Sequence, residues 1–405
     1  MYPGALIREY LLLGLRFDRV ESGYVDAYTG DPALRQTVAA EPAPDPAELA
    51  RQAEGLMAQI GNALEKDRAD FIRAHLRALA CAGRKFAGHS VGFVEEVDAY
   101  FDVRIGKGDQ DRYRQAHRKL DDALGGTGSL AERMQAYRSA DEIAPQRLAE
   151  CIEAFSSALR DRVRAEYPLP DGETIVYEVV TDKPWSGFNY YLGDYRSKVA
   201  VNADLRQQMS NLPRLVAHES YPGHHTEHCR KEAGLVHCRG QAEQTIFLVN
   251  TPQCLMAEGL ADLALYAAIG ARWGSWAADI YAELGLRFDG ERAEAIADAS
   301  TTLADVRQDA ALMLHDEHRD ADEVADFLRR WLLVDDRRAG QMLRFLSSPL
   351  WRAYTSTYVE GYRLLRGWLD ARPDGVSLVE RFTRLLDEPL IPSALRDRVA
   401  GPDVG

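Results

Sequence analysis

The eight residues HESYPGHH, from His218 to His225, constrain the fold of this chain more than any other segment. They contain three histidines and one glutamate and directly follow an apolar run at residues 212–217, which favours a helix. Pro222 has no backbone N–H with which to continue that helix, and Gly223 adopts backbone angles that other residues avoid. We therefore predict that the helix kinks or bulges at Pro222-Gly223.

The side chains around this break predict a shared metal ion. In the pattern His-Glu-x-x-His, two imidazoles one helical turn apart bind zinc and the glutamate acts as general base. With Pro222-Gly223 looped out, His224 takes the place of the second imidazole after His218. In an unbroken helix, His225 would face the same side as His218 but lie roughly 10 Å further along the axis. We predict His218 and His224 as ligands, with His225 as the alternative. The competing interpretation is a histidine-rich helix end that is solvated or caps the helix.

A third metal ligand is expected from a second helix, and Glu258 is the candidate. Thr251 and Pro252 are a typical N-cap and first helical residue, and the apolar sequence after them predicts a buried helix to about Ile269. A carboxylate inside so apolar a helix is costly to bury unless it is paired or bound to a metal. Asp262, one turn later, is placed to orient a ligand histidine. Taken alone, Glu258 fits a salt bridge to an arginine equally well.

The pattern His-Glu-x-x-Pro-Gly-His-His, followed by Glu-Gly-x-Ala at residues 258–261, resembles a bacterial family called domain of unknown function 885. That family is grouped with the thermolysin-like zinc metallopeptidases. The resemblance is strongest in the C-terminal half, from about Val199 to Gly361. It implies that residues 199–202 form an edge strand, which would pair with an extended peptide substrate.

The sequence differs from the family pattern at three places. Leu260 and Leu263 stand where members of the family carry aromatic residues. The late Pro-Gly-Gln-Ala segment of the family is replaced by residues 349–352, Pro-Leu-Trp-Arg, with altered spacing to the Tyr-Val-Glu-Gly sequence at 358–361. The predicted metal ligands are unaffected, and the differences concern the substrate class.

Two imidazoles and one carboxylate predict one Zn²⁺ per chain, with one coordination position left for water. Glu219 is then the candidate general base on the zinc-bound water, which attacks a carbonyl and passes its proton to the leaving nitrogen. The resemblance implies that Tyr358 donates to the developing oxyanion, and Tyr354 and Tyr362, one turn on either side, are alternatives. The competing interpretation of Tyr358 is a core aromatic residue with a satisfied hydroxyl.

These residues predict a zinc-dependent hydrolase of amide or peptide bonds, acting on short peptides reached through a confined cleft. One alternative is a zinc amidase acting on a non-peptide or modified peptide substrate in a biosynthetic pathway. Another is a non-catalytic peptide-binding protein on a peptidase fold, although such a protein has no need of Glu219 beside the histidines. The expected partner is a peptide or a small amide.

The charge of the chain narrows the class of partner. Its 405 residues include 49 lysines and arginines against 63 aspartates and glutamates, a net charge of −14. This charge opposes binding to nucleic acid and favours cationic or neutral substrates. The arginines at 329–330 and 337–338 are interleaved with Asp335 and Asp336, which is typical of a solvated helix face.

Cysteine usage and the N-terminal sequence indicate the compartment. Five irregularly spaced cysteines favour a reducing compartment over a disulfide framework: Cys81, Cys151, Cys229, Cys238 and Cys254. The N-terminus lacks the basic start and long apolar run of a signal peptide. No apolar stretch reaches the roughly 18 residues of a membrane span. We expect a cytoplasmic protein with no membrane partner, and its oligomeric state is not indicated.

The expected fold class is mainly α (α+β), a helical body with a small, mostly antiparallel sheet beside the metal-site helix. Amphipathic helices make up an N-terminal helical region at residues 1–170. The catalytic region spans residues 171–405. Its expected parts are a small sheet at 173–202 with strands at 174–180 and 188–192, metal-site helices at 211–270, and C-terminal helices that include 321–334 and 350–371.

Overall fold

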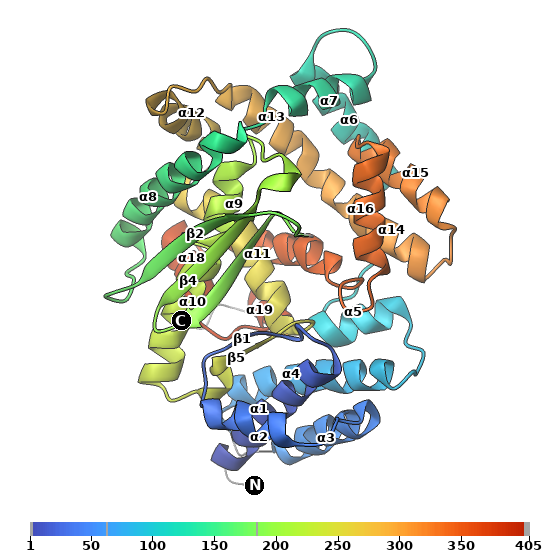
Figure 1. The fold of residues 1–405 in the computed structure, drawn as a ribbon, viewed down its shortest axis with the longest axis vertical. Coiled ribbons are helices and arrows are strands. Elements are labelled where there is room, and N and C mark those ends of the chain that lie inside the picture. The colour runs from blue at the N-terminus through green and yellow to red at the C-terminus, as the bar shows by residue number, and fades with distance from the viewer. Residues whose placement is uncertain (1–2, 62–63, 184, 401–405) are drawn as a thin grey trace.

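The computed structural model describes residues 3–61, 64–183 and 185–400, and it shows a mainly helical protein with two small β-sheets (Figure 1). The predicted fold class is confirmed. The α-helices are α1 (Pro3–Val20), α2 (Pro32–Ala40), α3 (Pro46–Gln59), α4 (Lys66–Phe86), α5 (Phe93–Phe101), α6 (Gln110–Leu124), α7 (Leu130–Ala140), α8 (Leu148–Glu166), α9 (Leu212–Glu219), α10 (His224–Lys231), α11 (Pro252–Ile269), α12 (Trp273–Glu283), α13 (Gly290–Ser300), α14 (Asp305–His315), α15 (Ala321–Leu332), α16 (Asp336–Ser347), α17 (Tyr362–Asp370), α18 (Leu378–Asp387) and α19 (Pro392–Ala400). The strands are β1 (Val25–Tyr28), β2 (Thr174–Val180), β3 (Gly187–Gly193), β4 (Arg196–Asn202) and β5 (Ile246–Leu248).

The three-stranded sheet has the order β2-β4-β3, and it corrects one prediction. Strand β4 pairs in parallel with β2 and antiparallel with β3, whereas β1 and β5 form a separate antiparallel pair. Strands β2 and β3 match the strands predicted at 174–180 and 188–192. The prediction that residues 199–202 form an edge strand is wrong, because they belong to the central strand β4. Their side chains are buried on both faces, as is usual for a central strand. The edge strand that contacts α9 is β3.

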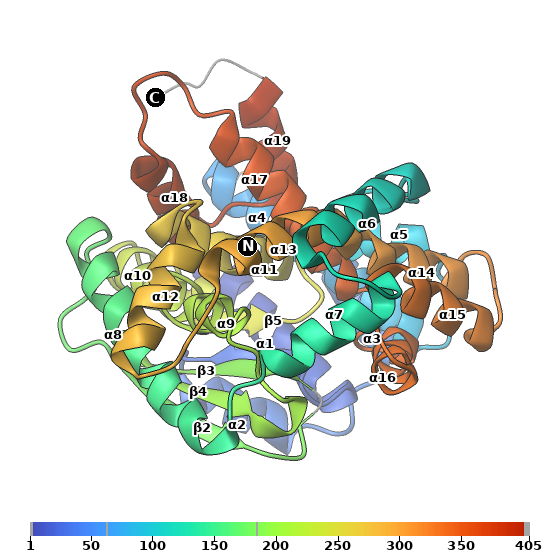
Figure 2. The same cartoon turned by 90° about the horizontal axis from the view of Figure 1, so that it is seen from above.

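Helix α11 runs through the core, and most of its side chains are buried. Its bounds match the prediction, with Thr251 before it and Gly270, at a φ of 84°, after it. Figure 2 shows α8, α12 and the three-stranded sheet on one side of α11, and α6, α7 and α14 to α16 on the other. Within the described residues, no single helix is long and apolar enough to cross a membrane. Helices α11 and α12 pass that test only as a pair, with a bend of 75° between them.

The helix predicted at residues 350–371 is less regular than expected. Residues 349–354 form turns, a π-helix η6 spans Thr357–Gly361, and α17 follows it. A Cβ added to Gly259 of α11 would come within 2.5 Å of the Gly361 carbonyl carbon. Glycine at these two positions lets η6 lie directly against α11, which brings the tyrosines of this segment close to Glu258.

The N-terminal helices are joined to the rest of the chain by long-range pairing. Strand β1 pairs with β5, and Arg68 Nε of α4 donates a 2.6 Å hydrogen bond to Glu243 Oε1. The division into regions 1–170 and 171–405 stays a prediction.

Candidate metal centre

The helix carrying the HESYPGHH sequence breaks where it is predicted to break. Helix α9 ends at Glu219 and α10 begins at His224, with a cis peptide bond before Pro222. The Gly223 N–H donates to the carbonyl of Ala217 at 3.0 Å, so the intervening residues bulge outward. A Cβ on Gly223 would lie 2.0 Å from the His218 carbonyl oxygen. Only glycine allows this close approach, which sets the position of the second histidine.

His218, His224 and Glu258 converge to form a group that could bind a metal ion, with one ligand atom from each lying within 4.8 Å of the others. His218 Nε2 lies 3.2 Å from Glu258 Oε2, and His224 Nε2 lies 3.9 Å from Glu258 Oε1. Ligands about 2.1 Å from a tetrahedral zinc are about 3.4 Å apart, so these separations fit one ion. Glu258 Oε2 is buried without a hydrogen bond of good geometry within the described residues, as suits a metal-facing oxygen.

The Asp262 carboxylate orients the His218 ring. His218 Nδ1 lies 3.1 Å from Asp262 Oδ1, as predicted for a histidine that binds metal through Nε2. Burial would lower the pKa of His218, but its contacts with Asp262 and Glu258 outweigh burial and raise that pKa well above its usual value. Burial and the charge of His218 lower the pKa of His224, which therefore favours its neutral, metal-binding form.

The Glu219 carboxylate lies at the inner face of β3. A Cβ on Gly187 would be 3.0 Å from Glu219 Oε1, and Asn189 Nδ2 donates to the Glu219 carbonyl at 2.6 Å. Burial raises the pKa of Glu219 to about 7, with opposing contributions from positive His218 and negative Glu258. A carboxyl group with a pKa near neutrality suits proton transfer at physiological pH.

Two tyrosines of the 350–371 segment lie at this site. The Tyr354 hydroxyl donates a 2.7 Å hydrogen bond to Glu258 Oε1, and the Tyr354 and Tyr358 rings are 5.7 Å apart. Burial, together with the negative charges of Glu258 and Asp262, raises the pKa of Tyr358 well above its usual value. No hydrogen bond to the site residues involves the third candidate, Tyr362, within the described part of the chain. The tyrosine that contacts Glu258 is therefore Tyr354, one helical turn before Tyr358.

The altered segment at 349–352 positions Tyr354. Lys85 Nζ donates to the Pro349 carbonyl at 2.6 Å, and Arg352 Nε donates to Glu96 Oε2 at 2.9 Å. Lys85 also donates to Glu96 Oε1 at 2.5 Å, so α4 and α5 hold this segment through one buried carboxylate. The other altered residues, Leu260 and Leu263, are buried in the core.

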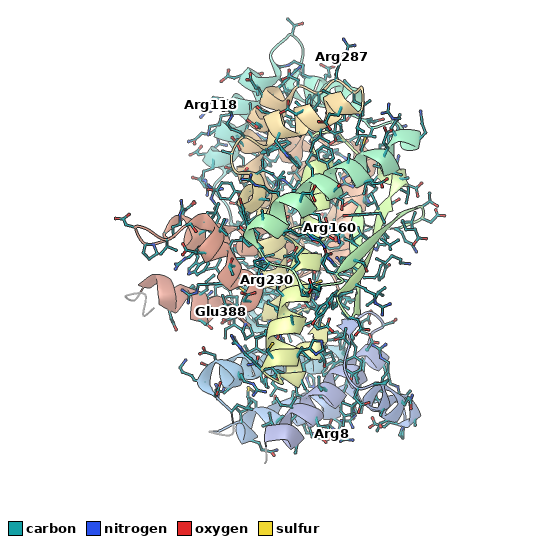
Figure 3. The ribbon with its side chains drawn as sticks, turned by 90° about the vertical axis from the view of Figure 1, so that its left-hand side faces the viewer. Arg8, Arg118, Arg160, Arg230, Arg287 and Glu388 are labelled. Carbon is teal, nitrogen blue, oxygen red and sulfur yellow. The ribbon has the colours of Figure 1, made fainter. Side chains whose placement is uncertain are left out.

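His225, the alternative ligand, points away from the group into a buried polar network. Its Nδ1 lies 2.8 Å from Ser197 Oγ and its Nε2 lies 3.0 Å from Glu173 Oε2. Tyr221 donates to the same carboxylate oxygen at 2.7 Å, and Arg160 Nε donates to Oε1 at 2.8 Å. Figure 3 views this side of the molecule, with Arg160 labelled on α8. The network ties the bulge between α9 and α10 to the sheet.

Asp26 on β1 is a site neighbour that the sequence did not reveal. Within the described residues its carboxylate has no hydrogen bond, and burial together with the charge of Glu258 raises its pKa to about 7. Its charge also contributes to the raised pKa of Glu219. No motif surrounds Asp26, and only the pairing of β1 with β5 brings it here.

The overall fold is similar to two solved bacterial proteins. A candidate lipoprotein from Colwellia psychrerythraea matches with a TM-score of 0.52 and 14% identity, over 87% of this chain and 65% of its own. A candidate lipoprotein of unknown function from Shewanella oneidensis matches with a TM-score of 0.53 and 12% identity, over 91% of this chain and 76% of its own. The chain thus spans just under two thirds of the Colwellia protein. At such identities the likeness concerns the fold alone.

An M32 carboxypeptidase from Deinococcus radiodurans R1 matches with a TM-score of 0.40 and 13% identity, over 99% of this chain and 95% of its own, which is too weak to argue a shared fold. No protein-family model matches the chain, and no curated protein is similar to it at a significant level. The resemblance to the domain-of-unknown-function 885 family therefore rests on the motif residues, and its structural counterpart is the His218, His224 and Glu258 group.

Proposed function

We propose that the protein is a zinc-dependent hydrolase of amide or peptide bonds. The observation that supports this best is the convergence of His218, His224 and Glu258. Glu219 directly follows His218 on α9. When bound there, a zinc ion would supply Lewis acidity and lower the pKa of a water molecule.

Each side chain of the site then has a distinct task. Glu219 accepts the proton of the attacking water and delivers it to the leaving nitrogen. Asp262 orients His218, and Tyr354 orients Glu258. Tyr358 is left as the donor to the developing oxyanion, since the hydroxyl of Tyr354 is already engaged.

Strand β3 is the proposed docking edge for an extended peptide. It is an edge strand of the three-stranded sheet and contacts α9, and Gly187 leaves room for the Glu219 carboxylate beside it. An extended segment adding to this edge would place its carbonyl groups next to the predicted general base. The role that the resemblance assigns to residues 199–202 thus moves to β3.

Metal stoichiometry of the purified protein tests the proposal. We expect about one zinc per chain, lost in His218→Ala, His224→Ala and Glu258→Ala. The matched variant Glu219→Gln should keep its zinc and lose hydrolysis of a library of short peptides. A native protein that neither contains nor binds zinc would favour a non-catalytic peptide-binding protein. One that binds zinc but leaves every peptide intact would favour an amidase with another substrate.

A further inference from the structure

Three arginines from different helices lie together on the α14 side of the site. They are Arg138 of α7, Arg307 of α14 and Arg338 of α16, here called the arginine cluster. Figures 1 and 2 both place these helices on the same side of α11, away from the three-stranded sheet. The positive charges of Arg307 and Arg138 act on Arg338, and Arg307 lies close enough to the Tyr358 hydroxyl and the Asp262 carboxylate to interact with both. The cluster therefore continues outward from Tyr358.

None of the three arginines forms an ion pair with a carboxylate within the described residues, although most arginines of this acidic chain do. Arg138 donates to the carbonyls of Leu332, at 3.1 Å, and Leu333. Arg338 Nη1 donates to Gln341 at 2.7 Å. The Arg307 side chain makes no hydrogen bond or ion pair to any described residue. The charge of Asp335 acts on Arg138 and Arg338, but its side chain caps α16 by accepting from the Arg338 backbone N–H at 2.8 Å. Arg307 is therefore the member of the cluster whose side chain has no carboxylate partner among the described residues.

The surroundings of Arg307 favour a ligand and not a solvated surface position. Its side chain is exposed, yet the protein around it removes enough hydration to lower its pKa. Asp262, whose negative charge acts on Arg307, contacts His218 at 3.1 Å and forms no ion pair with Arg307.

Contacts of the residues next to Arg307 fix the position of α14 relative to η6 and α17. The next residue, Gln308, donates to Glu360 Oε1 of η6 at 2.9 Å, and Arg363 of α17 pairs with Asp305 of α14 at 3.0 Å. The segment that carries Tyr358 is therefore tied to the helix that carries Arg307. An anion held by Arg307 would lie at a set position relative to the predicted oxyanion donor.

We propose that the arginine cluster, with Arg307 foremost, binds a carboxylate of the substrate next to the predicted metal centre. A guanidinium binds a carboxylate through two parallel hydrogen bonds, and no carboxylate of the described residues forms an ion pair with Arg307. The carboxylate is either the C-terminus of a short peptide or an acidic side chain. The inference rests on the proposed hydrolase function, and it reverses locally the preference for cationic or neutral substrates expected from the net charge.

Calorimetric titration of the full-length, zinc-loaded Glu219→Gln protein tests this proposal without turnover. The probes are N-acetylated dialanine, its C-terminal amide, and N-acetylated alanyl-glutamate amide, which has an acidic side chain but no terminal carboxylate. At least one acid probe should bind about tenfold or more tightly than dialanine amide. Preference for the first probe identifies a terminal carboxylate, and preference for the third identifies an acidic side chain.

Substitutions attribute that preference to the cluster. Adding Arg307→Gln should abolish it while the zinc content stays at one per chain, and Arg307→Lys should keep part of it. Arg337→Gln, an equal change of charge at an exposed neighbour of Arg338, should preserve it. Equal binding of all three probes, or no binding of any, overturns the proposal. A preference that survives both Arg307→Gln and Arg338→Gln also overturns it. If the native protein bound no zinc or hydrolysed no peptide, that result would instead count against the hydrolase function itself.

Discussion

The two neighbouring tyrosines, Tyr354 and Tyr358, differ in their contact with Glu258. One oxygen of Glu258 accepts the Tyr354 hydroxyl, and the other faces His218 without a well-formed hydrogen bond. The Tyr358 ring packs edge-on against Tyr354, and its hydroxyl forms no hydrogen bond with this carboxylate. At the scale of the residue, the Tyr354 hydroxyl is thus bonded to the predicted ligand Glu258, whereas no described residue forms a hydrogen bond with the Tyr358 hydroxyl.

This difference predicts different losses in two variants. Tyr354→Phe should weaken zinc binding about 10- to 100-fold, because it removes the hydrogen bond that orients Glu258. Tyr358→Phe should leave zinc affinity unchanged and lower kcat about 100- to 1,000-fold. Competition with a chelator measures the first effect, and steady-state kinetics measures the second. The same loss of zinc in both variants would contradict the assignment.

Glu173 predicts a specific loss of stability in acid. Burial would raise its pKa, but hydrogen bonds from His225, Tyr221 and Arg160 outweigh burial and lower that pKa to about 2. Since the folded-state pKa is depressed from the ordinary value of 4.5, the stabilisation, about 3 kcal/mol, is present above pH 4.5. It is lost as the pH falls from 4.5 towards 2.

Denaturant titrations across this pH range measure the effect. The free energy of unfolding of the native chain should fall more steeply below pH 4.5 than that of Glu173→Gln, which cannot titrate at this position. Parallel pH profiles for the two proteins would show that Glu173 does not contribute.

At the scale of elements, the contact between α11 and η6 decides where the tyrosines lie. Gly259→Ala would place a Cβ 2.5 Å from the Gly361 carbonyl carbon, so η6 must move away from α11. We expect a destabilisation of about 1–3 kcal/mol together with weaker zinc binding, since Tyr354 moves with its segment.

Gly367→Ala on α17 is the matched control. A Cβ there meets no atom within 4 Å, and alanine favours the helix by about 0.5–1 kcal/mol over glycine. Thermal unfolding and zinc titration of both variants check the prediction. If Gly259→Ala and Gly367→Ala changed stability and zinc affinity to the same extent, the close approach at Gly259 would be unimportant.

At the scale of the whole molecule, one metal ion would join elements that are distant in the chain. The predicted ligands come from α9, α10 and α11, and α11 lies at the centre of the core. An ion that binds only the folded state adds about 2.7 kcal/mol at a concentration 100 times its Kd. Zinc should therefore raise the Tm of chelator-treated protein by a few degrees, and His218→Ala should show no such rise. An equal rise in that variant would mean that zinc binds elsewhere.

Much of the site follows from short-range sequence patterns. The break at Pro222-Gly223 and the bounds of α11 depend on residues that act on their own or adjacent backbone. The same holds for strands β2 and β3, whose β-branched and aromatic residues favour extended structure. The proximity of His218 and His224 is predictable because the bulge restores a known ligand spacing. Glu258, on another helix, is expected as the third ligand only from the usual composition of such sites.

Other features depend on contacts between distant parts of the chain. The central place of β4, the approach of Asp26 through β1 and β5, and the engagement of Tyr354 by Glu258 all join segments that no local pattern connects. The arginine cluster likewise requires three helices to pack together, and of its members only Arg338 lies in a stretch that the sequence predicts as a solvated, charged helix face. The sequence by itself determined where helices break and which residue types are available for a metal. Only the tertiary structure decided which side chains meet, because long-range packing, and not local backbone preference, sets those distances.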